Sequence, residues 1–273
     1  MTPALHQATV GDNAFPPGDS PPVRDQLRRM APERLAAIDQ ALGPAPHALP
    51  SAVMGRGLDL GQLDRLTQGL ALDGLPAAIR RSSRSRQLAY LGGRLCAETA
   101  LLALTGRCEA VGTGDGGAPC WPAGVVGSIA HTRDGAWAAV SLGAAHWRVG
   151  IDSESVVDED GARDIVALCC TPWERARWFE VLDPLRATLL FSAKESVYKA
   201  IHPQVKRFVD FDEVEMVECP ALEWPPHRDG DAPIGGQLRF RPTPAGPLAG
   251  QFPELRVDAR VIDAVVHTAL VES

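Results

Sequence analysis

Hydrophobic residues recur along this chain with two different spacings, which predict different elements. Residues 83–104 follow a helical period, with Ser82 or Ser83 able to cap the start and Gly106 after the end. A helix is also predicted over residues 25–43, and two more begin at "TPWE" (171–174) and at "DP" (183–184), the second running to about Ile201. Residues 1–22 read as a loose leader and 44–62 as mostly loop.

Short β-prone segments follow the helices of each half and predict strands. They are "GSIAHT" (127–132), "AWAAVSL" (136–142), "HWRVGIDSE" (146–154), "FDEVEMVEC" (211–219), "QLRFRP" (237–242) and a final strand within 255–271. The segment before them, "TGDGGAPCWPAGVVG", has too much Gly and Pro for regular structure, and residues 220–233 form a Pro-rich loop. Helix followed by strands, twice, predicts an α+β fold with two similar halves, residues 1–149 and 150–273.

Composition narrows the class of protein. The apolar content of 45% supports a packed core, and the net charge of −7 argues against a general nucleic-acid binder. Apolar runs stay well short of a membrane span, and no secretory signal is visible. The six cysteines form no C-x-x-C pair and no Cys/His cluster with zinc spacing, which favours free thiols in a reducing cytoplasm.

Two carboxylates two residues apart are the first candidate chemistry. In a strand at 146–154, Trp147, Val149 and Ile151 share one face, which we expect to be core, while Asp152 and Glu154 share the other. Such a pair either lies at a solvated edge or holds a hard divalent cation such as Mg²⁺.

The stretch "FSAKESVYKA" (191–200) adds a third carboxylate. Ser192 and Glu195 match a capping box, but a helix that starts at 183–184 makes Ser192 interior. Glu195 and Lys199 are one turn apart, and they are either a surface ion pair or part of a site facing the two acids. In the second case Lys199 would contact a phosphate oxygen.

The other candidate binding residues also have structural interpretations. His131, with Ser128 nearby, is structural or presents its ring to a ligand from the end of a strand. The cluster "RRSSRSR", with Arg86, and Arg94 beyond it, is solvated, binds nucleic acid or captures phosphate. "GTGDGG" (112–117) matches a dinucleotide motif in letters, but the prolines that follow it prevent the required helix.

Taken together, "GSIAHT", "VGIDSE" and "FSAKESVYKA" resemble the 4′-phosphopantetheinyl transferases, in particular the branch that serves siderophore, non-ribosomal peptide and polyketide synthases. The resemblance covers about residues 84–216 and includes "RQLAYLGGRLCAETAL" and "GGAPCWPAGVVGSIAHT". It implies two α/β subdomains, each with a helix on a small antiparallel sheet, related by pseudo-twofold symmetry with the active site between them.

The resemblance also implies a reaction: the phosphopantetheine arm of coenzyme A moves to a serine of an apo carrier protein, with Mg²⁺, and adenosine 3′,5′-bisphosphate leaves. Asp152, Glu154 and Glu195 would hold the metal, with Glu195 or a water near it as base. Lys199, His131, Ser128, Arg94 and, as a weaker match, Arg86 would bind coenzyme A. The protein would be a cytoplasmic monomer with no nucleic-acid or membrane partner.

Three departures from the family pattern bear on coenzyme A binding: Ala130 where Ser is frequent, Ser153 between the acids, and no basic residue in 112–117. The alternatives are another Mg²⁺-dependent phosphate-ester enzyme such as a hydrolase, a basic-patch nucleic-acid binder, and a family member that has lost activity.

Overall fold

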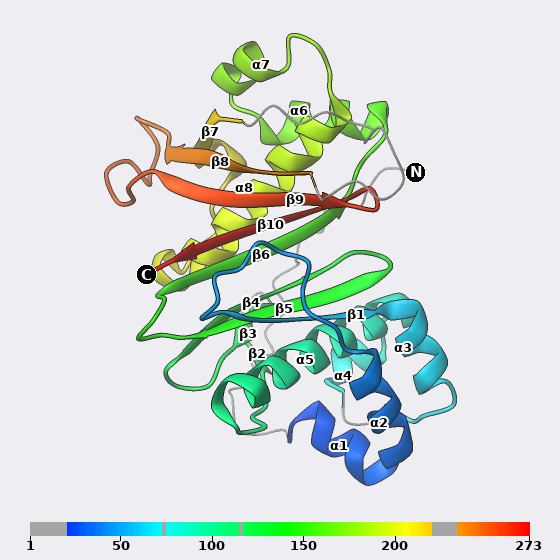
Figure 1. The fold of residues 1–273 in the computed structure, drawn as a ribbon. Coiled ribbons are helices and arrows are strands. Elements are labelled where there is room, and N and C mark those ends of the chain that lie inside the picture. The colour runs from blue at the N-terminus through cyan, green and yellow to red at the C-terminus, as the bar shows by residue number, and fades with distance from the viewer. Residues whose placement is uncertain (1–20, 73–74, 115–116, 220–233) are drawn as a thin grey trace. The chain divides into compact units, whose positions relative to one another are not determined.

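A computed structural model describes residues 21–72, 75–114, 117–219 and 234–273 (Figure 1). Most of the predicted leader, the predicted loop at 220–233 and part of "GTGDGG" lie outside the described residues. The described chain forms two compact units. The C-terminal unit consists of Arg148–Glu272 and the short segment Pro46–Ala48, and the N-terminal unit consists of the remainder up to Trp147.

The C-terminal unit is built on a five-stranded antiparallel sheet in the order β6-β10-β9-β8-β7. Its strands are β6 (Arg148–Ser155), β7 (Val214–Glu218), β8 (Ile234–Pro242), β9 (Leu255–Ile262) and β10 (Val265–Glu272). Its helices are α6 (Glu159–Cys169), α7 (Pro172–Trp178) and α8 (Pro184–Val205), and the 3₁₀ turn Phe211–Glu213 precedes β7. Helix α8 packs on β6 and β10 (Figure 1), which places its residues beside the acidic strand.

Local signals explain where these helices begin. The Asp183 side chain accepts a hydrogen bond from the Arg186 amide and caps α8, with Pro184 in the first turn. Thr171 and Glu174 form a complete capping box at the start of α7. Both predicted starts are confirmed.

The N-terminal unit has a three-stranded antiparallel sheet in the order β1-β5-β4. Its strands are β1 (Met54–Asp59), β4 (Val125–His131) and β5 (Gly135–Leu142), with a separate two-residue ladder of β2 (Gly112–Thr113) and β3 (Pro119–Cys120). Its helices are α1 (Val23–Met30), α2 (Pro32–Ala41), α3 (Leu60–Thr67), α4 (Ala77–Arg80) and α5 (Arg84–Thr105). Helix α5 packs on β5 and β1 in Figure 1.

Helix α5 confirms its predicted ends. The Ser83 side chain accepts from the Arg86 amide, and Gly106 adopts φ 73°, a left-handed conformation that glycine reaches at no steric cost. Most of the interior of α5, from Leu88 to Leu101, is buried. Helices and antiparallel sheets together confirm the α+β class.

Three predicted elements are wrong. The helix at 25–43 is two helices, because Ala31 precedes Pro32 and takes φ −153°, outside the helical region. The predicted loop at 44–62 contains β1 and the start of α3, because Leu58 and Leu60 are buried despite the surrounding glycines. The final segment is the hairpin β9–β10, whose turn residues Asp263 and Ala264 have positive φ.

Two further expectations are corrected. Trp147, expected in the core, has 49% of its surface exposed, because β6 begins one residue later at Arg148. The Gly- and Pro-rich segment before "GSIAHT" is not wholly irregular, since it holds the β2–β3 ladder. None of the described helices combines the length and apolar character that crossing a bilayer requires.

Candidate active site

Strand β6 and helix α8 bring four predicted site residues together in the C-terminal unit. Gly150 permits their close approach, since a Cβ at this position would lie 2.8 Å from the Ala200 amide nitrogen on α8. Side chains alternate along a strand, so Asp152 and Glu154 lie on the same face of β6 as Gly150, toward α8. Helix α8 supplies the other two residues.

Lys199 forms an ion pair with Asp152, with its Nζ donating to Oδ1 at 2.6 Å. The Asp152 side chain is 6% exposed and that of Lys199 is 27% exposed. The second carboxylate oxygen of Asp152, Oδ2, is buried and has no hydrogen-bond partner among the described residues. A buried acceptor without a donor is costly, so Oδ2 is a position where a cation would be favourable.

Burial, more than mutual repulsion, shifts the pKa values of the two glutamates. Burial, followed by the charge of Asp152, raises the pKa of Glu154 to about 8, although Lys199 opposes the shift. Burial also raises the pKa of Glu195, where Lys199 opposes and Asp152 reinforces the effect. Burial disfavours the ammonium of Lys199, but Asp152 and Glu195 outweigh this and raise its pKa. As full carboxylates, the three acids would carry more negative charge than Lys199 neutralises, so protons or a cation must balance them.

The three carboxylates do not form a finished metal cage. Within the described residues, no group of three or more His, Cys, Asp or Glu side chains is close enough together to hold a metal ion. The chemistry of the donors nevertheless fits a hard divalent cation. Asp152 offers a buried oxygen that has no partner among the residues described, and two further carboxylates, whose pKa values are raised, lie on the same elements. Such a cation would have to compete with Lys199 for Asp152.

Interior contacts fix the orientation of α8. Ser192 is fully buried and its hydroxyl lies 2.9 Å from that of Thr268 on β10, so it is an interior residue and not a cap. Lys194, also buried, pairs with Glu174 at 2.7 Å and donates to the carbonyl of Cys169. These contacts hold the turn of helix that carries Glu195, and sequence reasoning did not identify the Lys194–Glu174 pair.

A second feature missed by sequence reasoning lies on the opposite face of β6. Ser153 is fully buried, and its hydroxyl contacts the rings of His47 and His267. The polar residue between two acids was the available signal, since a buried hydroxyl needs partners. The partner His47 is 106 residues distant in sequence, which no local pattern reveals.

The other predicted site residues belong to the N-terminal unit. Arg94, on α5, is 5% exposed, and its Nη2 donates to the carbonyl of Gly112 at 2.9 Å and lies 3.0 Å from the Thr113 hydroxyl. Its guanidinium also lies 4.6 Å from the centre of the Tyr90 ring, and burial lowers its pKa. Its Nε has no hydrogen-bond partner among the described residues. Arg94 thus secures strand β2 and retains one donor.

The remaining three residues differ in accessibility. His131 is exposed at the end of β4, Ser128 is buried on the same strand, and Arg86 is exposed on the first turn of α5. Exposure at the end of a strand leaves the imidazole of His131 accessible to a ligand.

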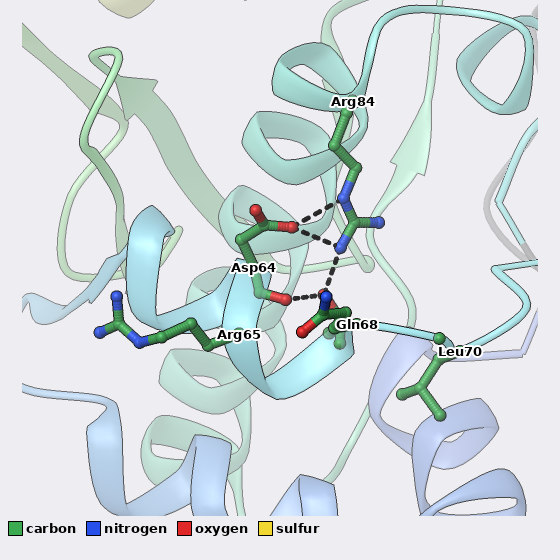
Figure 2. A pocket seen from close by; sticks show the side chains of 7 residues that line it. Asp64, Arg65, Gln68, Leu70 and Arg84 are labelled. Atoms are coloured by element: carbon green, nitrogen blue, oxygen red, sulfur yellow. Dashed lines mark hydrogen bonds and ion pairs between the residues drawn. The ribbon is translucent and has the colours of Figure 1, made fainter.

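The basic cluster before α5 is partly neutralised. Arg84 donates from Nε to Asp64 Oδ1 at 2.8 Å and from Nη2 to the Thr67 hydroxyl at 2.8 Å. These groups line a pocket of about 280 Å³, and Figure 2 shows Arg84 directed at Asp64 while Arg65 points away from it. Because Asp64 already neutralises Arg84, this pocket is not a built anion site.

Two family models match the chain. The 4′-phosphopantetheinyl transferase N-terminal domain matches residues 75–141, and the 4′-phosphopantetheinyl transferase superfamily matches residues 148–233. The second match contains both β6 and α8, which carry the four acidic and basic residues grouped above.

Individual proteins also match the chain. The 4′-phosphopantetheinyl transferase Npt of Nocardia iowensis is 38% identical over 141 residues, which are 50% of this chain and 62% of the relative. Enterobactin synthase component D of Salmonella typhi is 36% identical over 46% of this chain and 53% of its own length. The 4′-phosphopantetheinyl transferase PptT of Mycobacterium tuberculosis is 36% identical over 54% of this chain and 65% of its own length.

Each match thus spans less than two thirds of the relative. The two family matches follow one another along the chain, and the second falls on the strand and helix that form the acidic group. These findings confirm the resemblance seen in the sequence: the chain belongs to the 4′-phosphopantetheinyl transferase superfamily.

Proposed function

We propose that this protein transfers the 4′-phosphopantetheine group of coenzyme A to a serine hydroxyl of an apo carrier protein and releases adenosine 3′,5′-bisphosphate. The observation that carries the proposal is the cluster of Asp152, Glu154 and Glu195 on β6 and α8, with Lys199 paired to the buried Asp152, inside the segment that matches the superfamily. Relatives named as 4′-phosphopantetheinyl transferases and as enterobactin synthase component D support carrier domains of siderophore, peptide or polyketide synthases as acceptors.

Asp152, Glu154 and Glu195 would hold Mg²⁺. When bound, the ion supplies charge neutralisation for the pyrophosphate of coenzyme A, which phosphoryl transfer requires more than covalent assistance. The support for this assignment is Asp152 Oδ2, which is buried and has no hydrogen-bond partner in the described part of the chain, and the raised pKa of Glu154, which reflects burial and the neighbouring charge of Asp152.

Glu195 is the proposed base. The hydroxyl oxygen of the carrier serine attacks the phosphorus attached to pantetheine, the bond from that phosphorus to the oxygen of the nucleotide breaks, and the serine proton passes to Glu195 or to a water beside it. A carboxylate whose pKa is raised by burial accepts a proton more readily than an exposed glutamate. Lys199, whose Nζ donates to Asp152 in this structure, would donate to an oxygen of the pyrophosphate.

Residues of the N-terminal unit are proposed to bind the nucleotide of coenzyme A. His131 and Arg86 are exposed and can reach a ligand, while the buried Ser128 supports strand β4. Arg94 keeps Nε for the 3′-phosphate, although its Nη2 is already engaged with strand β2. We also propose that the chain has two halves, residues 1–149 and 150–273, related by pseudo-twofold symmetry around a shared site.

We also propose a cytoplasmic monomer, with coenzyme A and the carrier protein as its partners and with neither nucleic acid nor membrane. The acidic net charge of −7 supports the absence of a nucleic-acid partner. Sedimentation equilibrium of the purified chain tests the monomer.

The experiment that tests the function separates transfer from hydrolysis. Coenzyme A and Mg²⁺ are incubated with the protein, with and without an apo carrier protein, and both nucleotide release and carrier mass are followed. A transferase releases adenosine 3′,5′-bisphosphate only with the carrier present and in proportion to its gain in mass. Release without a carrier would identify the hydrolase instead.

A further inference from the structure

Ser153 lies at the centre of a small buried network in the C-terminal unit. Its hydroxyl is 3.1 Å from Nε2 of His47 and 2.9 Å from Nδ1 of His267. His47 Nε2 also lies 3.1 Å from the carbonyl oxygen of Asp152. Both imidazoles are buried, with 3% and 4% of their surfaces exposed, and their rings meet edge to face at 5.2 Å.

The chemistry of these groups fixes the direction of one hydrogen bond. A carbonyl oxygen only accepts, so Nε2 of His47 must carry the proton and donate to Asp152. The same N–H is then also directed at the Ser153 hydroxyl, which shares a second hydrogen bond with Nδ1 of His267.

The network sits directly behind the acidic face of β6. In the β6–β10 ladder, Ser153 is paired with His267 and Asp152 with Thr268. Thr268 contacts the hydroxyls of Ser192 and Ser196 on α8, so this pair faces the helix. Neighbouring residues of a strand point to opposite faces, which places the Ser153–His267 pair on the other side.

We infer that His47 and His267 are positioning residues that, through Ser153 and the carbonyl of Asp152, set the direction in which Asp152 and Glu154 present their carboxylates to a divalent cation. The inference rests on the proposed function, because it assigns the metal to these acids. His47 is particularly informative, since it comes from Pro46–Ala48, a three-residue segment that packs with the C-terminal unit although the chain on either side belongs to the other.

An ordinary core would not require this arrangement. An apolar residue at position 153 would need no hydrogen-bond partner, whereas the buried serine hydroxyl contacts two histidines. The bond from His47 to the main chain of Asp152 acts on the residue whose carboxylate Oδ2 has no partner among the described residues. Groups that orient metal ligands in this way typically change metal affinity by about 10–100-fold when they are removed.

The test measures binding of Mn²⁺ to the full-length protein, with free Mn²⁺ followed by electron paramagnetic resonance and no coenzyme A present. His47→Ala removes the donor, and His47→Gln restores an N–H at about the position of Nε2. Ser153→Ala removes only a hydroxyl and is the variant least expected to disturb folding. His146→Ala is the matched control, because His146 is also a buried histidine bonded to a serine, Ser141, at 2.8 Å, but in the N-terminal unit.

We expect His47→Ala and Ser153→Ala to weaken Mn²⁺ binding by about tenfold, while His47→Gln and His146→Ala stay within about threefold of the unmodified protein. In the transfer assay, the Mg²⁺ concentration that gives half the maximal rate should rise by a similar factor for His47→Ala and Ser153→Ala. Their kcat at saturating Mg²⁺ should stay close to that of the unmodified protein. A purely structural role would not divide the two parameters in this way.

Several results would overturn the inference. If folded His47→Ala and Ser153→Ala bind Mn²⁺ as well as the unmodified protein, the network is packing alone, and the proposed function still stands. If His146→Ala weakens binding equally, the effect is general destabilisation. If His47→Ala does not fold, Ser153→Ala decides the question. If the unmodified protein binds no Mn²⁺, the metal assignment of the proposed function fails and this inference fails with it.

Discussion

Replacing Lys199 by methionine removes an ammonium group while keeping a side chain of similar length. Its partner Asp152 is 6% exposed and bonded at 2.6 Å, so the change leaves a buried carboxylate without its cation. Breaking a fully buried pair from one side costs about 3–5 kcal/mol. Because Lys199 is 27% exposed and solvent can reach the vacated site, we expect a loss of about 2–3 kcal/mol in the free energy of unfolding.

A double-mutant cycle with Asp152→Asn isolates the pair. Urea unfolding of the parent, both single variants and the double variant is measured in buffer containing a chelator, so that no divalent cation substitutes for the ammonium. We expect a coupling free energy of at least about 1.5 kcal/mol. Lys206→Met, an exposed lysine at the end of the same helix, is the control and should change stability by less than about 0.5 kcal/mol. Additivity of the two single changes within about 0.5 kcal/mol would refute the reasoning.

Three further predictions concern other parts of the account. Glu195→Gln removes the proposed metal ligand and base with little change of shape, so kcat for transfer should collapse and Mn²⁺ affinity should fall. Wild-type turnover at every Mg²⁺ concentration would contradict both proposed roles. Arg94→Ala should weaken the binding of coenzyme A about ten- to a hundredfold more than the binding of 3′-dephospho-coenzyme A, as measured by calorimetry. An equal loss of affinity for both ligands would mean that Arg94 only supports strand β2. Glu98 accepts hydrogen bonds from the amides of Val23 and Arg24, and burial raises its pKa to about 7, so the folded protein holds a proton that the unfolded chain has released. The contribution of Glu98 to the free energy of unfolding should therefore fall by about 3 kcal/mol between pH 4.5 and pH 7 and stay level above pH 7. If the free energy of unfolding of Glu98→Gln depends on pH as fully as that of the parent, Glu98 is not the group responsible.

The sequence predicted the elements whose ends carry chemical signals. Helices α5, α7 and α8 begin at residues with capping side chains, Ser83, Thr171 and Asp183, and each start was found where expected. Strand β6 was also predicted, with Asp152 and Glu154 on one face. Capping and strand alternation act within a few residues, which is why a local reading can recover them.

Elements that depend on distant contacts were missed. Strand β1 forms because it pairs with β5 and covers α5, and its own glycine-rich sequence gives no such signal. The direct bond between Lys199 and Asp152 joins residues 47 apart, and the network around Ser153 joins β6 to His47 and to β10. The roles of the site residues stay predictions, because each role is defined by the ligand that the residue binds.

The central claim is tested most directly by the intact mass of a carrier protein. An apo carrier domain from a siderophore or peptide synthase is incubated with this protein, coenzyme A and Mg²⁺, and the mass is measured by electrospray. The account predicts a gain of one phosphopantetheine group on the carrier serine, and no gain with folded Asp152→Ala. An unchanged carrier mass across a panel of such domains, or an undiminished gain with Asp152→Ala, would contradict it.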